Sequence, residues 1–489
     1  MPKSSDKISS SVDPVRIETA HSSPSHQTGH KCPRLEQNEK ASSAHSDLLL
    51  LFSFYFSHHR HWRVNLSGPI PILTCAPVPT FSQLQEHYNA TYAQINYSVA
   101  IPALALAVSP LFWTPFADIY GRRTVCIAGC TLALAATIGS ALAPTYSGYM
   151  VLRFLQGWGV GPASTVGLQM LQDTYSELER GATVGFWTAS IDLGLLFGPL
   201  LGGFAAMASF TWPAWLTAIM FGILLVVMLF GMPETAPSTF SHDRKQPFLN
   251  VTPIPNVTRP KLWSTTVNCL RMFAYPKVAI PIVFYCWAWY WFIMCPITMI
   301  PAAFPTYSPQ TQGLLFIGLI LGTALAEALC SGRLSDNLVT KFSIAGSRSP
   351  EHRLWLYWPA AAATVLGLIL FGCSIQFSWH WMIVQVSLAV MAFGVQIGNT
   401  TTVSYCVDCY PNLAMDVTAF YSLHLNLSAF ASPFFIVPWV TRNGWALSFG
   451  LQGLIVAVCT LLVIGPFQWW ARRSTTGSCS NGLSSLHFV

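Results

Sequence analysis

The chain has 489 residues, of which 52% are hydrophobic and only 9% are charged, and its formal net charge is +6. A soluble domain carries about 25% charged residues, so this chain has too few charges to cover a water-facing surface of its size. The composition therefore excludes a soluble globular protein and predicts an all-α polytopic membrane protein.

Residues 1–60 are rich in Ser, His, Lys and Gln, and they predict a disordered cytosolic tail without a signal peptide. The stretch 64–81, "VNLSGPIPILTCAPVPTF", is our candidate for the first membrane helix. It contains four prolines, which interrupt the backbone hydrogen bonds that a helix needs in lipid. We therefore expect a weak, short first helix here.

Eleven further segments are long and apolar enough to cross a bilayer, which takes about 20 residues. The stretch 232–276 interrupts them, contains several Lys, Arg and Pro, and predicts a central cytosolic loop. The sequence thus predicts twelve spans in two six-helix halves, 61–231 and 277–470, followed by a cytosolic tail, 471–489. The eleven segments are 96–117, 124–143, 148–171, 182–208, 212–231, 278–302, 310–331, 354–376, 380–406, 415–439 and 445–468.

The distribution of Lys and Arg predicts the orientation of the chain. With the N-terminus inside, every Lys and Arg of the predicted loops and tail after residue 81, except Arg442, falls on the inner side. Cytosolic loops are the ones that accumulate such residues, so both termini are predicted to be cytosolic. The sequon "NAT" at Asn89 then lies outside and is a candidate glycosylation site.

Two related loops carry a candidate cytosolic latch. The loop after the second span reads "ADIYGRR", and the end of the eighth span reads "SGRLSDNLV". A glycine permits a tight turn, and Asp and Arg side chains can form contacts that break when the halves move. The expected latch residues, including an aspartate that closes the tenth span, are Asp118, Gly121, Arg122, Arg123, Gly332, Arg333, Asp336 and Asp408.

Four polar residues inside predicted spans are candidates for proton coupling. Arg153 and Gln156, in "RFLQGWG", lie three residues apart on one helical face, and a lone arginine inside a span is costly enough to indicate a function. A structural ion pair is the alternative. Asp192 in the fifth span and Glu327 in the eighth are carboxylates that can exchange protons or bind a cationic group. Glu327 lies near the cytosolic end, where it can equally belong to a latch.

The fifth span contains "GLLFGPLLGG". Its glycines recur every four residues and give one smooth face on which a partner helix can approach closely, and its proline bends or weakens the helix. A passive packing role is the alternative. The residues of this motif are Gly194, Gly198, Pro199, Gly202 and Gly203.

Five residues are candidates for a substrate cavity. Gln396, Asn399 and Thr400 place polar groups on adjoining positions of the tenth span. His424 in the eleventh span can titrate, although a hydrogen-bonded interior histidine is the stronger alternative. Tyr290 belongs to the aromatic run "FYCWAWYWFIM" of the seventh span, for which a lipid-facing or interfacial position is an equal alternative.

From about residue 76 to 470 these motifs resemble the major facilitator superfamily, specifically its fungal twelve-span drug:proton antiporter group. The loop is similar to the signature G-x-x-x-D-[RK]-x-G-R-[RK], although Thr114 replaces the first glycine and Ile119 the basic residue. "RFLQGWG" resembles the pattern R-x-x-Q-G. "GLLFGPLLGG" matches the antiporter signature G-x-x-x-G-P-x-x-G-G at every fixed position.

This resemblance implies the major facilitator fold and a role for Arg153 in proton coupling. It also implies that the glycine face of the fifth span packs against the eighth span, where Gly318, Gly322 and Ala326 recur every four residues. His424 departs from the residues that are usual in the group.

We therefore expect a secondary transporter that exports a small organic compound in exchange for protons by alternating access. A proton-coupled importer of a polyamine, siderophore or nutrient is one alternative. A non-transporting receptor or a defective copy is another, because the first helix is short. We expect no enzymatic activity, cofactor, metal or nucleic-acid partner, and a lipid-embedded monomer in the plasma membrane, with the vacuolar membrane as the alternative.

Overall fold

The computed structural model describes residues 75–174, 180–232, 262–341 and 350–480, which belong to one compact unit, Asn65–Val489. All regular secondary structure within these ranges is helical. Ten of the described helical segments are long and apolar enough to cross a membrane. The prediction of an all-α polytopic membrane protein is therefore confirmed for the described part of the chain.

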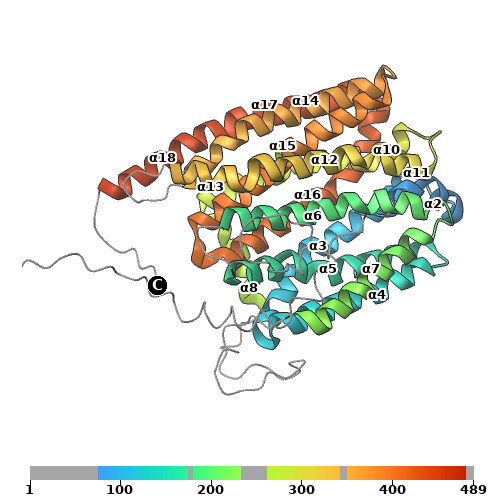
Figure 1. Ribbon diagram of the computed structural model, residues 1–489, viewed down its shortest axis with the longest axis horizontal. Helices are drawn as coiled ribbons and strands as arrows, with labels where there is room; N and C mark the ends of the chain where they lie inside the picture. The colour runs from blue at the N-terminus through green and yellow to red at the C-terminus, as the bar shows by residue number, and fades with distance from the viewer. Residues whose placement is uncertain (1–74, 175–179, 233–261, 342–349, 481–489) are drawn as a thin grey trace, which may run out of the picture. The chain divides into compact units, whose positions relative to one another are not determined.

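The first half begins with a short 3₁₀ turn and a short helix, which precede five long helices (Figure 1). These elements are η2 (Val78–Thr80), α2 (Phe81–Tyr88), α3 (Tyr92–Tyr120), α4 (Arg122–Ala141), α5 (Tyr146–Thr174), α6 (Arg180–Ala205) and α7 (Trp212–Gly231).

In the second half, π turns or short breaks interrupt several of the predicted spans. The seventh span comprises α9 (Pro276–Phe284), the π turn η6 (Tyr285–Tyr290) and α10 (Trp291–Ala303). The eighth comprises α11 (Pro309–Leu314), α12 (Phe316–Ala326), the π turn η7 (Glu327–Ser331) and α13 (Gly332–Lys341). The remaining elements are η8 (Pro350–Leu356), α14 (Tyr357–Gln376), α15 (Trp381–Cys409), η9 (Pro411–Leu413), α16 (Ala414–Asn443), α17 (Trp445–Cys459), the π turn η10 (Thr460–Ile464) and α18 (Gly465–Ser480).

The structure differs from the predicted spans in several places. The described end of the predicted first helix, residues 75–80, forms a turn and the 3₁₀ turn η2 in place of an α-helix, and residues 64–74 lie outside the described part. Prolines at 77 and 79 explain this difference, because they remove the backbone donors that an α-helix uses. The predicted central loop contains α8 (Leu262–Arg271) and the 3₁₀ turn η5 (Met272–Ala274), and α18 continues the last span into the predicted tail.

The same helix pairs pack in both halves, as a duplicated architecture requires. In the first half α5 packs against α3 and α4, and α4 packs against α7. In the second half α15 packs against α12 and α14, and α14 packs against α17. Figure 1 shows α14 and α17 at the top, α4 and α7 at the bottom, and α3, α6 and α16 between them. Contacts between helices of the two halves, among them α3 with α16 and α6 with α11, α12 and α15, join the halves.

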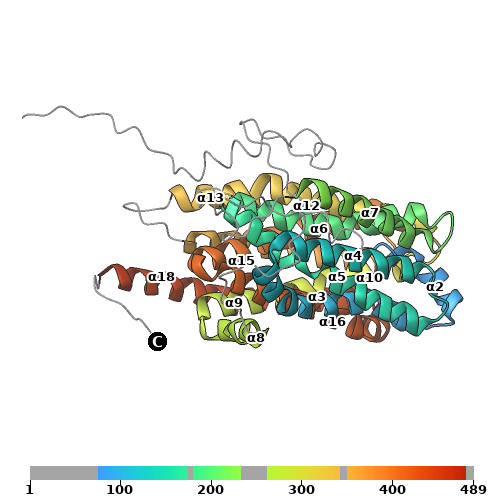
Figure 2. The same cartoon turned by 90° about the horizontal axis from the view of Figure 1, so that it is seen from below.

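Local sequence explains where the long helices begin and end. Gly121, between α3 and α4, has a φ of 93°, and Gly444, between α16 and α17, has a φ of 75°. Side chains other than glycine rarely adopt this backbone conformation, so these two glycines permit abrupt turns between consecutive helices. At the opposite end of α3, Thr91 and Gln94 form a capping box. Figure 2 shows α2 at one end of the bundle and α8, α13 and α18 at the other.

Candidate functional site

The contact between α6 and α15 gathers polar side chains from the two halves. α6 belongs to the first half and packs against α15, α12 and η7 of the second half. Thr188 and Asp192 lie one turn apart on α6, and Gln396, Asn399 and Thr400 lie close together on α15. The fold therefore brings together polar groups that are far apart in the sequence.

Glu327, the first residue of the π turn η7, is hydrogen-bonded to α15. Gln396 Nε2 donates to Glu327 Oε2 at 3.2 Å, and Thr400 Oγ1 donates to the same oxygen at 3.3 Å. Thr188 joins this group, because its hydroxyl lies 3.0 Å from that of Thr400 and 3.3 Å from Gln396 Nε2. Gly185 of α6 makes room for the carboxylate, since a Cβ there would overlap Glu327 Oε1. Glu327 therefore lies in the contact between the halves.

Asp192 is the end of a row of hydrogen bonds that crosses three helices. Asn399 Nδ2 donates to Asp192 Oδ2 at 2.7 Å, and the hydroxyl of Tyr421, on α16, donates to Asn399 Oδ1. An amide has a donor side and an acceptor side, so these two bonds together fix its orientation. The row thus connects α16, α15 and α6.

Burial and charge distinguish the carboxylates from their partners. Thr188, Gln396, Asn399 and Thr400 are at most 2% exposed, whereas Asp192 is partly exposed. Asp192 lies within electrostatic range of Glu327, so each carboxyl group disfavours a negative charge on the other.

One hydrogen-bond acceptor of the network, the side-chain oxygen of Gln396, has no partner in the described part of the chain. Gln396 Oε1 is buried and accepts no hydrogen bond within the described part of the chain, although the other side of the same amide donates to Glu327. A buried acceptor without a partner costs about 1–3 kcal/mol, so the arrangement favours a partner that brings donors.

The aromatic run of the seventh span faces this region from the π turn η6. Tyr285 and Tyr290 are buried, and their hydroxyls lie within electrostatic range of Asp192. Tyr285 donates to the Val395 carbonyl of α15 at 3.2 Å, and the Trp289 ring packs on Gly398. The alternative that these aromatics face lipid is wrong for all three, because the wide π turn directs them into the protein.

Arg153 lies in a separate polar contact within the first half. It is 2% exposed, and its Nε donates to the Ser98 carbonyl of α3 at 3.1 Å. Its Nη1 donates to Gln156 Oε1 at 2.6 Å, as the three-residue spacing on α5 permits. Arg153 therefore ties α5 to α3, and its role in proton coupling stays a prediction.

The glycine motif of α6 meets the eighth span at α11. A Cβ on Gly203 would meet the Pro309 carbonyl oxygen at 2.5 Å and the Cα of Gly313 at 3.0 Å. Gly202 faces another segment, because a Cβ there would overlap the carbonyl of Ala76. The two helices can approach this closely only without side chains at the contact. Gly194, Gly198 and Pro199 are also buried.

The expected partners of this motif on α12 are wrong. Cβ atoms on Gly318 and Gly322 would meet backbone oxygens of Gln385 and Ala389, which belong to α15. Since residues four apart share one face of a helix, α15 covers the small-residue face of α12. The contact of this motif with the eighth span is made by Gly203, which meets Gly313 of α11, whereas Gly202, on the face with four-residue spacing, meets Ala76.

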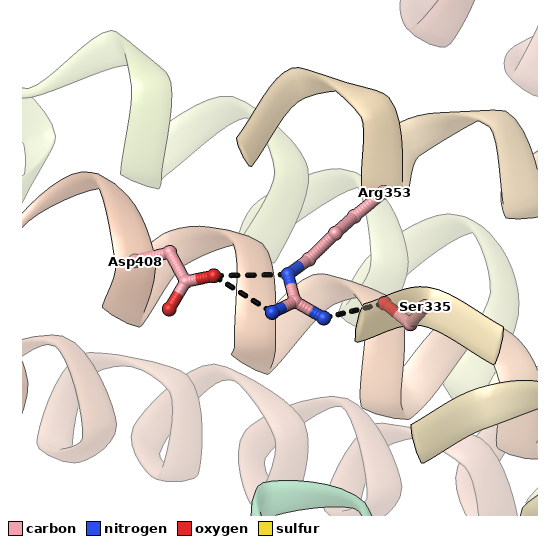
Figure 3. Close-up of polar contacts among 3 residues, drawn as sticks. All are labelled: Ser335, Arg353 and Asp408. Atoms are coloured by element: carbon pink, nitrogen blue, oxygen red, sulfur yellow. Dashed lines mark hydrogen bonds and ion pairs between the residues drawn. The ribbon is translucent and has the colours of Figure 1, made fainter. Parts of the chain in front are cut away.

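At the predicted cytosolic end, Asp408 is held by an arginine to which the sequence assigned no role. Arg353 is only 3% exposed. Its Nε and Nη2 both lie 2.9 Å from Asp408 Oδ2 (Figure 3). On the other side of the guanidinium, Nη1 donates to Ser335 Oγ at 2.6 Å. The guanidinium thus joins the ends of α15, η8 and α13. The other expected residues of this latch, Gly332, Arg333 and Asp336, lie on α13, but their side chains are outside the described part.

The equivalent loop of the first half joins three helix ends. Asp118, near the end of α3, lies within electrostatic range of Arg122 and of Asp416, which lies in the first turn of α16. Arg123 Nη2 donates to the Leu229 carbonyl of α7 at 2.5 Å. Together with the turn at Gly121, these contacts place the predicted latch residues at the junction of α3, α4 and α7.

Two further candidates lie away from the network. His424 is buried, its Nδ1 lies 3.0 Å from the Phe420 carbonyl, and the rings of Phe273 and Phe420 flank it. It is therefore the hydrogen-bonded interior histidine of the stronger alternative. Asn89 is exposed in a left-handed conformation at the end of α2, and its glycosylation stays a prediction.

Sequence reasoning missed three residues of these sites. Thr188 lies four residues before Asp192, so the spacing on α6 could have identified it. Tyr421 and Arg353 reach their partners from other helices, and no spacing in the sequence signals those contacts.

The sequence model of the Major Facilitator Superfamily matches residues 74–433. "Probable efflux pump mfs2" of Aspergillus flavus is 24% identical over 409 residues, which are 80% of this chain and 96% of the relative. "MFS antiporter QDR3" of Candida albicans is 33% identical over 173 residues, which are 35% of this chain and 24% of that protein.

A solved structure is similar in fold. The xylose transporter XylE from E. coli, in a partially occluded inward open conformation, superposes with a TM-score of 0.61 at 15% identity. The match covers 81% of this chain and 94% of the solved chain.

Proposed function

Because the chain belongs to the Major Facilitator Superfamily, and is therefore an integral membrane transporter and not an enzyme, we propose that it exports a small organic compound in exchange for protons. The observation that carries this proposal is the network between the halves, in which two carboxylates, Asp192 and Glu327, lie on opposite sides of a contact that alternating access must break. A group at such a contact can bias the movement of the halves by gaining or losing a proton.

The direction of transport is supported by two features. α6 carries both Asp192 and the glycine motif that resembles the antiporter signature. The names of the relatives, an efflux pump and an antiporter, agree with export. Import on the same fold is the alternative that an experiment must exclude.

The proposed cycle uses the network as a contact that opens and closes. With Asp192 charged, the bond from Asn399 is charge-assisted and holds α6 to α15. Protonation removes that charge and weakens the bond between Asn399 and Asp192, so the two halves separate more easily at this contact.

We propose that Asp118, Arg122, Arg353 and Asp408 act as cytosolic latches in the same movement. We also propose that the N- and C-termini are cytosolic, and that the protein works as a monomer in the plasma membrane.

Accumulation of labelled compounds in cells with and without the protein tests this function. We expect lower accumulation in expressing cells, and a loss of the difference when the proton gradient is collapsed. The Asp192→Asn variant should lose the dependence on the gradient. Higher accumulation in expressing cells would show import, and an unchanged gradient dependence in the variant would remove Asp192 from the mechanism.

A further inference from the structure

The eighth span is broken at Leu315, between α11 and α12, and a side chain of another helix bridges the break. In an uninterrupted α-helix the Gly318 N–H would donate to the Leu314 carbonyl, four residues earlier. Here the side-chain amide of Gln385, on α15, bonds to both groups. The Gly318 N–H donates to Gln385 Oε1 at 2.7 Å, and Gln385 Nε2 donates to the Leu314 carbonyl at 3.0 Å. A side chain inserted into a helical hydrogen bond is a recognised cause of a helix break.

The inserted amide needs a glycine at position 318. A Cβ on Gly318 would meet Gln385 Oε1 at 2.6 Å and the backbone oxygen of Gln385 at 2.5 Å. Before the break, the Leu315 N–H donates to the Gln312 carbonyl, three residues earlier, at 3.2 Å, which tightens the last turn of α11. No proline lies between residues 310 and 326. The break is therefore made by the contact of α12 with α15.

Residues 304–314, which we call the outer segment, are held together internally. Gln312 is 4% exposed, and its Nε2 donates to the carbonyls of Phe304 and Tyr307 at 3.1 and 3.2 Å. The rings of Phe304 and Tyr307 stack, with their centroids 5.0 Å apart. Figure 1 shows α11 at the same end of the bundle as α2, opposite α13 and α18. The outer segment can therefore move as one piece.

The outer segment packs on the first half, although it belongs to the second half by sequence. α11 contacts α6 and η2. A Cβ on Gly313 would meet the Pro199 carbonyl oxygen at 2.9 Å and the Cα of Gly203 at 3.2 Å, so no side chain separates α11 from α6 there. After the break, α12 also contacts α6, but its Gly318 face lies on α15 of the second half. The bridged break thus lies where the eighth span changes from one half to the other.

We propose that Gln385 is a positioning residue for alternating access, which makes Leu315 a hinge between the outer segment and α12. The outer segment then stays with α6 while α12 moves with α15, and the outer end of the eighth span acts as a gate. The inserted amide satisfies both backbone groups, so the break leaves neither of them without a partner in the membrane. Such hinges are a few residues at the ends of elements that absorb the change in backbone angles. This inference rests on transport by two moving halves, as the proposed function does, but not on its direction or on protons.

Distances between spin labels in the full chain, in lipid nanodiscs, test the hinge. The labels would be attached through non-natural amino acids at three exposed positions: Thr306 in the outer segment, Ala208 after α6, and Met382 at the start of α15. We expect one narrow distance distribution between Thr306 and Ala208, and a broad or two-peaked distribution between Thr306 and Met382. Gln385→Ala should reduce the second distribution to one narrow peak, because the direct helical hydrogen bond can then form and α11 and α12 become one helix.

Two further variants separate a hinge from a general effect on the fold. Gln385→Met fills the same space without a donor or an acceptor, so it should lower the temperature of unfolding and keep the broad distribution between Thr306 and Met382. Gln385→Ala should not lower the temperature of unfolding. Gln376→Ala is the matched control, because Gln376 also bonds to backbone, the Trp445 N–H at 3.0 Å, but at the start of α17. It should leave both distributions unchanged.

A distribution between Thr306 and Ala208 as broad as that between Thr306 and Met382, or two narrow distributions in the wild type, would overturn the proposal. Wild-type distributions in Gln385→Ala would overturn it as well. A Gln385→Ala variant that loses stability would show a purely structural role and have the same consequence. Neither measurement uses a transported compound or a proton gradient, so absence of export from cells would refute the proposed function and leave this test unchanged.

Discussion

At the scale of single residues, the structure makes Asn399 the pivot of the site. Its amide gives a donor to Asp192 and receives a donor from Tyr421, so one side chain connects three helices. The sequence predicted Asn399 and Asp192 as polar residues inside spans, because such residues are costly in lipid. It could not predict that they contact each other, since they lie on different halves and the contact depends on how α6 and α15 cross.

Replacing Asn399 with leucine should therefore impair both stability and transport. The change leaves Asp192 without its donor, at a cost of about 1–3 kcal/mol in the free energy of unfolding. Thermal unfolding in detergent micelles and gradient-driven export measure the two effects. Asn426→Leu is the matched control, because Asn426 bonds only to Ser422 of its own helix in the described network. Equal effects of the two variants would contradict the role given to Asn399.

Arg353 and Asp408 form the second residue-scale contact. Nε and Nη2 of Arg353 both lie 2.9 Å from Asp408 Oδ2, and Arg353 is nearly fully buried. A double-mutant cycle with Arg353→Met and Asp408→Asn should give a coupling energy of about 1.5–3 kcal/mol. Lys277 and Glu351 are buried to a similar extent, with side chains 22% and 4% exposed, but they make a single contact at 3.5 Å, so they should give a smaller coupling energy. A coupling for the buried pair no larger than for this control would show that Arg353 and Asp408 do not act as a latch.

At the scale of elements, the glycine motif of α6 fixes how closely the first half approaches α11. The sequence predicted that α6 packs against the eighth span through a face with glycines every four residues. α6 does pack against α11 and α12, but Gly203 makes the close contact, and Gly202 of the predicted face meets Ala76. It predicted the wrong residues on that partner, because the four-residue spacing of Gly318 and Gly322 identifies a smooth face but not the helix that covers it. The π turns η6 and η7, which orient Tyr290 and Glu327, leave no periodic signal in the sequence at all.

Gly203→Ala should destabilise the protein by about 1–3 kcal/mol, because the new Cβ would meet backbone atoms of α11 that cannot move aside. Gly222→Ala on α7 is the control, since nothing lies within 4 Å of its added Cβ, and it should be neutral or stabilising by up to about 1 kcal/mol. Unfolding midpoints of the two variants in micelles compare these effects. A Gly203→Ala variant as stable as Gly222→Ala would contradict the close contact of α6 and α11.

At the scale of the whole molecule, composition and hydropathy were sufficient to predict the class, and ordered motifs were sufficient to predict the family. Both follow from short-range properties of the sequence, namely the length of apolar segments and the spacing of charged loops. These short-range patterns could not predict which helices pack together. The pairs that repeat between the halves include α3 with α5 and α12 with α15. The proposed function depends on this level, because export requires that the two halves move against each other across the Asp192 network.

Exchange of an exported compound for protons in vesicles tests the central claim most directly. Proteoliposomes with the full chain would be loaded with a labelled compound that expressing cells export, and the outside would be acidified while an internal dye reports pH. We predict that the compound leaves as protons enter, and that Asp192→Asn vesicles show neither flux. Retention of the compound by wild-type vesicles, or equal proton entry in the Asp192→Asn variant, would contradict the account.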